Sequence, residues 1–424
     1  MRMTRLVRAD SLLKFVAFFA ALFLYLSCFR NAIIDDSYIT FTYARNLKET
    51  GIWGLFPNEV ANTSTSMLNT ILTAAAFVFG SHPVAAIALT SLELAGIGFL
   101  LIAISEGFFN SPTFGRLAFA AILANPLMIS TIGMECFLYA LVFLAALRAW
   151  QVAATSLMGI LLGLGVLVRP DAALWLPIFL IVTLGWKRRL AVVGLFLVPI
   201  IPWELFSWIK LGSFLPDTLI IKTAESWGIW NYLNGPVLYL QSFPFETLLS
   251  LVTLPFAFLG WRRSCPMAFR FRLIVTATAV IHFVAYSLLG TPPYHWYYVP
   301  VVIPIIILGA MGMADVIRRV TQAREKRSHR TELIFLSAFA VIACVPFMEA
   351  SGLRPKDAPI HSNWAPPSTY RDIGYAIQMV VKKDDPVWLE GELGGIAFYS
   401  RRRIYDRLSD RTLLIPWIEE MESR

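Results

Sequence analysis

The chain has 424 residues, of which 57% are hydrophobic and only 15% are charged, whereas soluble domains carry about 25% charged residues. So few polar side chains cannot cover so much apolar surface in water, and this composition excludes a soluble protein. The formal net charge of +8 does not indicate nucleic-acid binding, because the basic residues lie in short clusters between apolar runs, where they orient a membrane protein.

The apolar runs approach the length of a membrane-spanning helix, which predicts an all-α polytopic membrane protein. A transmembrane β-barrel is excluded, because it would show segments of about ten alternating residues instead. The cysteines, Cys28, Cys136, Cys265 and Cys344, do not have the spacing of a disulfide framework or a metal site.

The first helix is expected directly after the N-terminus, where Arg2, Arg5 and Arg8 precede an apolar run of roughly twenty residues, a full span. No cleavage site follows cleanly, so we interpret this segment as a signal anchor whose basic end stays in the cytoplasm. The later basic clusters, at 187–189, 262–272 and 318–330, are then also predicted to be cytoplasmic.

Further apolar stretches follow at 67–80, 83–107, 117–132, 136–150, 154–168, 171–186 and 190–208. If all of them crossed the membrane, the cluster at 187–189 would face outside, so one stretch must not cross. The stretch 67–80 is too short for a usual span and is predicted to form a helix on the outer membrane surface. With spans at 244–260, 273–290, 296–313 and 331–348, we predict about eleven transmembrane helices and an outer C-terminus.

Two domains are expected. Residues 1–348 form a transmembrane domain with a first extracytoplasmic loop at about 31–82. Residues 349–424, called the tail below, are charged, with a helix-like segment at 370–380 and a strand-like segment at 387–389. We interpret the tail as a small extracytoplasmic α/β appendage, which buries only a modest core and is expected to pack on the membrane domain.

The first loop carries two adjacent carboxylates, Asp35 and Asp36, directly after the first helix. One interpretation is a solvated pair at a helix end. The alternative is a carboxylate held against the bilayer by an ordered loop, since Tyr38 and Phe41 follow at helical spacing and turn residues come after them. In a partly desolvated site, such a carboxylate suits the removal of a proton from an acceptor hydroxyl in glycosyl transfer.

These residues belong to a longer series of motifs, at 35–47, Gly51, 56–59, 125–126, 133–135, 168–171, 212–218, Lys222, 296–300, 395–400 and 404–406. The series resembles that of the polyprenyl-phosphate-sugar-dependent glycosyltransferases of the C fold (GT-C). The arabinofuranosyltransferase subgroup, which includes the mycobacterial terminal arabinan transferase and pilin arabinosyltransferases, is the most similar. The resemblance covers nearly the whole chain in order, but the family's glycine, proline and tryptophan are missing at 62–69.

The resemblance implies a transferase that moves a sugar, arabinofuranose above all, from a polyprenyl phosphate donor to an extracytoplasmic acceptor such as a surface glycan or pilin. It implies Asp35 as general base, with Asp36 orienting the acceptor or holding a divalent cation. Glu135 would bind acceptor hydroxyls or share that cation, Mg²⁺ or Mn²⁺, which carboxylates and water suit. The alternative for Glu135 is an acid that stabilises a helix N-terminus.

Cations are expected to bind the lipid phosphate, and the candidates are Arg169 and Lys222. The alternatives are a salt bridge between Arg169 and Asp171 and an interfacial, snorkelling Lys222. The remaining candidates for substrate binding are Asp171, Arg45, Glu59 and His295, of which Arg45 has a structural alternative and His295 lies in an aromatic segment typical of a membrane interface. The basic run 401–403 is expected to be solvated.

Three rival functions remain open. A transporter or flippase of lipid-linked sugars would place charges in mid-helix and show repeated halves, whereas here Glu93 is the main intramembrane acid and no repeat is visible. A structural partner in a glycan-building complex would tolerate loss of the aspartates. A hexosyl- or mannosyltransferase belongs to the same class. The basic loops favour a multi-pass protein of the bacterial inner membrane.

Overall fold

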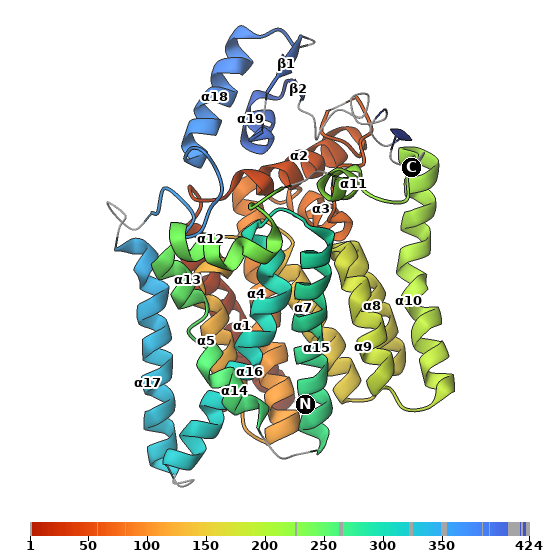
Figure 1. The fold of residues 1–424 in the computed structure, drawn as a ribbon. Helices are drawn as coiled ribbons and strands as arrows, with labels where there is room; N and C mark the ends of the chain where they lie inside the picture. Colours follow the sequence, from red (N-terminus) through yellow and green to blue (C-terminus); the bar gives the residue numbers. More distant parts are fainter. Residues whose placement is uncertain are drawn as a thin grey trace.

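The computed structural model describes residues 2–56, 58–80, 82–224, 227–262, 266–321, 325–348, 354–383, 385–389, 391–405, 416 and 419–420. Cys265 and the motif positions 57 and 406 lie outside these residues. Figure 1 shows long helices in a bundle, with shorter helices and the tail gathered at the end opposite the N-terminus.

The α-helices before the tail are α1 (Arg2–Ser27), α2 (Asp35–Thr50), α3 (Met67–Ala76), α4 (His82–Phe109), α5 (Thr113–Leu123), α6 (Pro126–Ile129), α7 (Cys136–Gln151), α8 (Thr155–Val168), α9 (Trp175–Val182), α10 (Trp186–Phe206), α11 (Asp217–Ala224), α12 (Gly235–Ser242), α13 (Pro244–Ser250), α14 (Leu254–Trp261), α15 (Pro266–Leu289), α16 (Val299–Val320) and α17 (Glu325–Cys344). Short 3-10 or π segments are η1 (Pro170–Leu174), η2 (Ser207–Leu211), η3 (Tyr232–Asn234), η4 (His295–Tyr298) and η5 (Val345–Phe347). The tail contains α18 (Pro367–Val380), β1 (Pro386–Trp388), α19 (Leu393–Ser400) and β2 (Arg403–Tyr405).

Within the described residues, six helices are long and apolar enough to cross a membrane. They are His82–Phe109, Trp186–Leu211, Pro244–Trp261, Phe269–Leu289, His295–Val320 and Lys326–Phe347. Shorter apolar helices occupy most of the other predicted spans. The chain is thus an almost all-helical membrane protein, and the count of eleven spans stays a prediction.

The helix α16 lies at the centre of the bundle and α17 lies at its edge. In their apolar windows, 78% of α16 is buried inside the protein but only 11% of α17. Figure 1 shows α17 at the edge of the bundle. Small residues let α14 approach α16 closely, since a Cβ added to Gly312 would lie 1.9 Å from the carbonyl oxygen of Phe256. Such small residues are typical of helix contacts in membranes, where van der Waals packing drives association. The apolar surface of α17 is left for lipid.

The predicted span 117–132 is wrong in its bounds, because the helix breaks in the middle of that range. Helix α5 ends at Leu123, and Asn125 accepts a hydrogen bond from the backbone of Met128 to begin the short α6. Pro126 causes the break, since a residue before proline is disfavoured in the α conformation. The Asn125 amide also donates to the backbone oxygen of Ser250 at 2.9 Å, which fixes this break to α13.

The helix α3 has ten residues, which rise about 15 Å, half the thickness of a bilayer core of about 30 Å. A helix of this length does not cross a bilayer, and its interfacial placement remains a prediction. Figure 1 shows α3 beside α2 at the end of the bundle that also carries the tail. The end with α2, α3 and the tail is called the upper end below.

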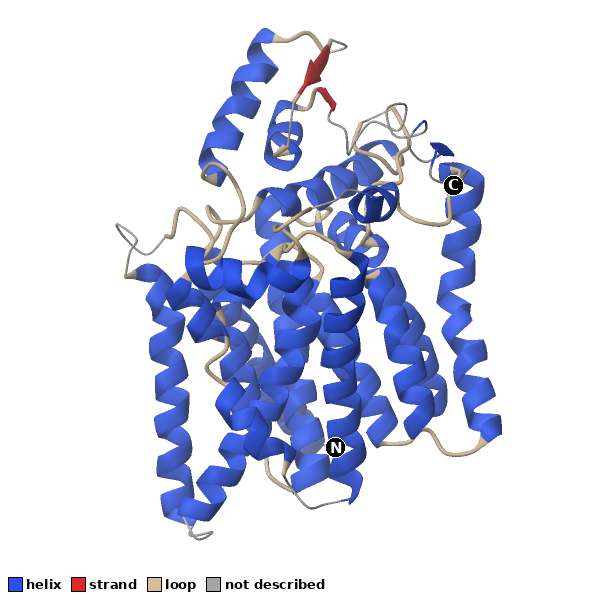
Figure 2. Ribbon diagram, viewed as in Figure 1, coloured by secondary structure: helices blue, strands red, loops and turns tan. Residues whose placement is uncertain are grey.

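The described tail residues form a small unit in which β1, α19 and β2 follow one another and the two strands pair in parallel. Figure 2 shows these strands above an otherwise helical structure. The tail lies directly on α2, because a Cβ added to Gly394 of α19 would lie 2.0 Å from the backbone oxygen of Asp35. Only glycine permits this approach.

Basic side chains of the tail reinforce this contact. Arg401 forms an ion pair with Glu49 at 3.3 Å, and Arg403 pairs with Glu59. Arg402 donates hydrogen bonds within the tail, to the backbone oxygens of Gln378 at 2.6 Å and Val381 at 2.8 Å. The run 401–403 is partly exposed, as expected for a solvated segment, and it also joins the tail to the first loop.

Candidate active site

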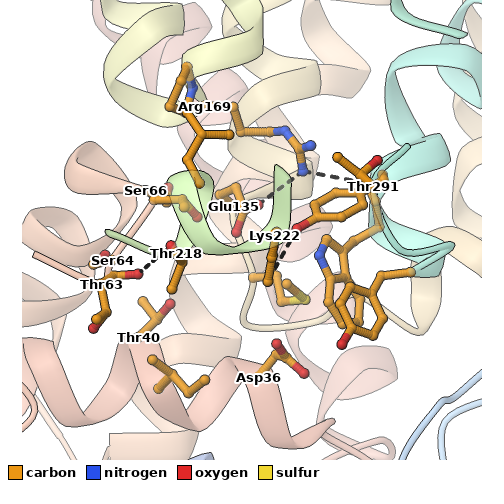
Figure 3. A pocket seen from close by; sticks show the side chains of 18 of the residues that line it. Asp36, Thr40, Thr63, Ser64, Ser66, Glu135, Arg169, Thr218, Lys222 and Thr291 are labelled. Atoms are coloured by element: carbon orange, nitrogen blue, oxygen red, sulfur yellow. Dashed lines mark hydrogen bonds and ion pairs between the residues drawn. The ribbon is translucent and has the colours of Figure 1, made fainter. Parts of the chain in front are cut away.

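A cavity of about 690 Å³ lies at the upper end of the bundle, between the first loop, the membrane helices and the tail. Its walls come from α2, the loop 63–66, η1, α11, the upper part of α15, η4 and the tail segments 362–364 and 391–393. Figure 3 shows polar side chains of α2, the loop 63–66 and α11 pointing into the same space as Glu135 and Arg169. Segments more than 300 residues apart in the sequence thus share one site.

Asp35 lies in the first turn of α2 and is almost fully buried, with 4% of its surface exposed. Its two carboxylate oxygens accept hydrogen bonds from the backbone N–H groups of Gly394, at 2.7 Å, and Gly395, at 2.6 Å. Burial raises the pKa of Asp35 to about 8, although the Gly395 N–H opposes this rise. The carboxylate is therefore engaged by the tail, and its proton affinity is high.

Asp36 is the next residue of α2 and lines the cavity with its side chain partly exposed. Burial raises the pKa of Asp36 to about 6, whereas the nearby Lys222 lowers it. At neutral pH this carboxylate is therefore mostly ionised and able to accept a proton. Figure 3 shows Asp36 on α2, opposite the pair of Glu135 and Arg169.

Arg169 is buried at the end of α8, and its guanidinium donates to two carboxylates. Nη1 lies 3.0 Å from Oε1 of Glu135, and Nη2 lies 3.0 Å from Oδ2 of Asp171. Tyr286 accepts from Nη2 at 3.0 Å and donates to the same Asp171 oxygen at 2.7 Å. The salt bridge between Arg169 and Asp171, which the sequence analysis gave as the alternative to phosphate binding, is present. A phosphate would have to compete with these partners for Arg169.

Lys222 on α11 presents a second cation to the cavity. Its ammonium donates to the Tyr297 hydroxyl at 3.2 Å and lies 5.1 Å from the centre of the Tyr294 ring. Burial lowers the pKa of Lys222, but Tyr297, Tyr294 and Asp36 outweigh it and keep this pKa above its usual range. Lys222 therefore remains charged beside Asp36 and is available for an anionic ligand.

The carboxylates in the cavity are not arranged as a binding site for a metal ion. In the part of the chain that the structure describes, no group of three or more His, Cys, Asp or Glu residues is placed to hold a metal ion. Asp36 and Glu135 line the same cavity, but Glu135 is paired with Arg169. We therefore derive no reaction step through a metal.

Three candidates from the sequence lie outside the cavity lining. Arg45 donates to the backbone oxygen of Phe398 and lies over its ring, 5.0 Å from the centroid, so it anchors the tail. Glu59 pairs with Arg403. His295 is fully buried beside the Tyr239 and Trp296 rings.

Other lining residues were not among the sequence candidates. Polar residues of the loop 63–66 and the tail residues Asn363, Trp364 and Glu392 line the cavity. Glu392 stands out as a candidate only in the structure. Its backbone has φ +50°, in the left-handed region that non-glycine residues rarely adopt. The sequence gives no periodic or motif signal at these tail positions, since their placement depends on how the tail folds back over α2.

No family model matches the chain, and no curated protein matches it either. Solved structures do match. The chain is similar to ArnT from Cupriavidus metallidurans in the apo state, with 17% identity, a TM-score of 0.67 and coverage of 98% of this chain and 90% of that one. The match to ArnT bound to undecaprenyl phosphate has 18% identity, a TM-score of 0.61 and coverage of 97% and 88%.

Two further structures are similar over most of this chain. An oligosaccharyltransferase from Archaeoglobus fulgidus has 12% identity and a TM-score of 0.52, with coverage of 94% of this chain and 65% of that one. The arabinofuranosyltransferase AftD from Mycobacteria has 12% identity and a TM-score of 0.51, with coverage of 89% and 29%. All of these proteins are glycosyltransferases of the GT-C fold. The chain therefore has the GT-C fold, which confirms the fold that the sequence resemblance implied.

Proposed function

We propose that the chain is a membrane glycosyltransferase that moves a sugar from a polyprenyl phosphate to an extracytoplasmic acceptor. The observation that carries this proposal is the placement of a partly exposed carboxylate, Asp36, and a charged amine, Lys222, in one cavity at the upper end of the bundle. A base and a phosphate-binding cation are the two groups that such a transfer needs.

The donor is proposed to enter from the membrane side of the cavity. Leu219 of α11 and Ala285 and Leu289 of α15 form an apolar part of the wall, and an isoprenoid chain would bury apolar surface there. The sugar phosphate would then lie beside Lys222. Arg169, with its donors engaged, would fix the wall and orient Glu135 in place of binding the phosphate directly.

The reaction follows from this arrangement. The acceptor oxygen attacks the anomeric carbon of the donor sugar, and its proton passes to the Asp36 carboxylate. The bond between the anomeric carbon and the phosphate oxygen breaks, and its electron pair leaves with the phosphate, whose charge Lys222 stabilises. We assign the base to Asp36 and not to Asp35, because both oxygens of Asp35 already accept backbone N–H groups.

The proposed sugar is arabinofuranose, on the sequence resemblance, and the proposed acceptor is a surface glycan or pilin. The similarity of the fold to AftD, an arabinofuranosyltransferase, supports a pentose, whereas a hexose remains the alternative. The proposed location is the bacterial inner membrane, with residues 1–348 as the catalytic domain and the tail on the extracytoplasmic side.

The test is a mass profile of envelope glycans and surface proteins from a strain that lacks the gene. The strain is complemented with the wild type, with Asp36→Asn, or with Glu59→Gln as a matched control, because Glu59 is a carboxylate of the same loop outside the cavity lining. We expect one sugar increment to vanish in the null strain and with Asp36→Asn, and to return with the control. Full restoration by Asp36→Asn at equal protein levels would refute the proposal.

A further inference from the structure

The outer wall of the cavity carries an exposed tryptophan. Trp364 lines the cavity, yet 78% of its surface is exposed, although indoles usually bury most of their surface. The other exposed tryptophan of the tail, Trp388, stacks on Tyr405 with ring centres 5.1 Å apart. Among the described residues, no aromatic ring or cation covers Trp364 in this way. One broad apolar face of the Trp364 indole is therefore accessible to a ligand in the cavity.

Hydrogen-bonding groups lie next to this ring. The carboxylate of Glu392 accepts from the Asn363 amide at 2.7 Å and from the backbone N–H of Trp364 at 3.3 Å. These bonds fix the carboxylate beside the ring, and the backbone of Glu392 is in the left-handed region. Gly391 lies against the same indole, since a Cβ added there would be 3.4 Å from it. Carboxylate, amide and indole therefore form one preorganised wall.

The charge of the cavity differs between its two sides. Lys222 lies on the side formed by α11 and η4, whereas Glu392 lies on the tail side, close enough to raise the pKa of both Asp35 and Asp36. An anionic phosphate is attracted to the first side and repelled by the second. The tail side suits a neutral ligand with hydroxyl donors and an apolar face, and a sugar ring has both, because its hydroxyls lie at its edge and its C–H bonds line its faces.

We propose that the tail carries the acceptor subsite, in which a sugar ring stacks on Trp364 and donates hydroxyl hydrogen bonds to Glu392 and to the amide oxygen of Asn363. This inference rests on the proposed function and narrows the acceptor to a glycan, in place of a polypeptide. The ring would lie between the tail and α2, with one hydroxyl directed to Asp36. Trp364 is in this role a positioning residue.

A binding experiment tests the subsite without a donor. The purified full chain, in a detergent that has no sugar head group, is mixed with methyl arabinofuranoside, with methyl mannopyranoside or with an N-acetylserine amide, and saturation transfer is recorded by NMR. We expect transfer to the ring protons of at least one glycoside but not to the serine amide. With Trp364→Ala the signal should fall about tenfold, as expected for the loss of a stacking partner, whereas Trp364→Phe should keep part of it.

Trp388→Ala is the matched control, because Trp388 is an exposed indole of the same tail outside the cavity lining. It should leave the signal unchanged. Equal signals from wild type and Trp364→Ala, or transfer to the serine amide alone, would overturn the subsite. Thermal melting of each variant shows whether the tail remains folded, and Glu392→Gln, which keeps the side-chain shape, should also weaken binding.

The mass profile separates this inference from the proposed function. If the null strain loses no sugar increment, the proposed function fails. If it loses an increment that sits on a polypeptide, the transferase stands and the sugar subsite is refuted. We expect an increment on a glycan that Trp388→Ala restores in full and that Trp364→Ala reduces about tenfold. In turnover by the purified protein, Trp364→Ala should raise the KM for the acceptor and leave the KM for the donor unchanged.

Discussion

The carboxylate of Asp35 accepts the backbone N–H of Gly395 at 2.6 Å, although 360 positions separate the two residues. This bond, with its neighbour from Gly394, ties the tail to the first turn of α2. Asp36 follows Asp35 directly, so the same turn that holds the tail also directs the second carboxylate to the cavity. The adjacent aspartates therefore have different surroundings, and we infer different roles for them.

Replacing Asp36 by asparagine should remove the proposed base and keep the shape of the side chain. General base catalysis contributes roughly 10²–10⁴-fold to a rate, so we expect kcat to fall by at least about 100-fold with little change in donor binding. Turnover of a lipid-linked sugar by purified protein measures this. Glu59→Gln should stay within about twofold of the wild type, because its ion pair with Arg403 is exposed and such pairs contribute little. Equal losses in both variants would contradict the assignment.

The pH dependence of turnover should report the ionisation of Asp36. A base is active when deprotonated, and the pKa of Asp36 is raised to about 6, so the rate should rise with pH through about 6 and level off above it. Lys222 lowers this pKa, so Lys222→Met should move the acid limb to higher pH. The exposed Lys210 supplies the control, and Lys210→Met should leave the limb in place. If the acid limb of Lys222→Met stayed at the pH of the wild type, Lys222 would not lie close enough to Asp36 to lower its pKa.

The close contact of Gly394 with α2 predicts a strong effect of one methyl group. Its Cβ would lie 2.0 Å from the backbone oxygen of Asp35, so Gly394→Ala should displace the tail and expose it to proteases. Limited proteolysis followed by mass spectrometry measures this. Gly194→Ala, at a position with nothing within 4 Å, should not change the cleavage pattern. A tail as protected as in the wild type would show that the docking is looser than described.

Arg169 should matter for stability more than for the chemical step. Removing one partner of a buried ion pair costs about 3–5 kcal/mol, since a charge is left uncompensated, and Arg169→Ala would leave both Glu135 and Asp171 in that state. We expect a large drop in the melting temperature of the purified protein. Lys222→Ala should lower it less, because Lys222 contacts mainly aromatic groups. The reverse order would refute this division of roles.

The sequence by itself determined the class of fold and the approximate positions of most helices, and it singled out Asp36 and Lys222, which line the cavity. Apolar runs and basic clusters are local properties, and the partition of side chains between lipid and water follows from them directly. The break at Pro126 was also encoded locally, but the apolar run masked it. Motif resemblance supplied the proposed reaction class, because the motifs recur in order along the chain.

Only the tertiary structure decided which polar residues share the cavity. Arg45 and Glu59 belong to the same loop as Asp36, yet they bind the tail at Phe398 and Arg403, outside the cavity lining. Trp364 and Glu392 reach the site from the far end of the chain. Such contacts depend on the packing of segments hundreds of residues apart, which no local pattern of hydrophobicity or charge specifies.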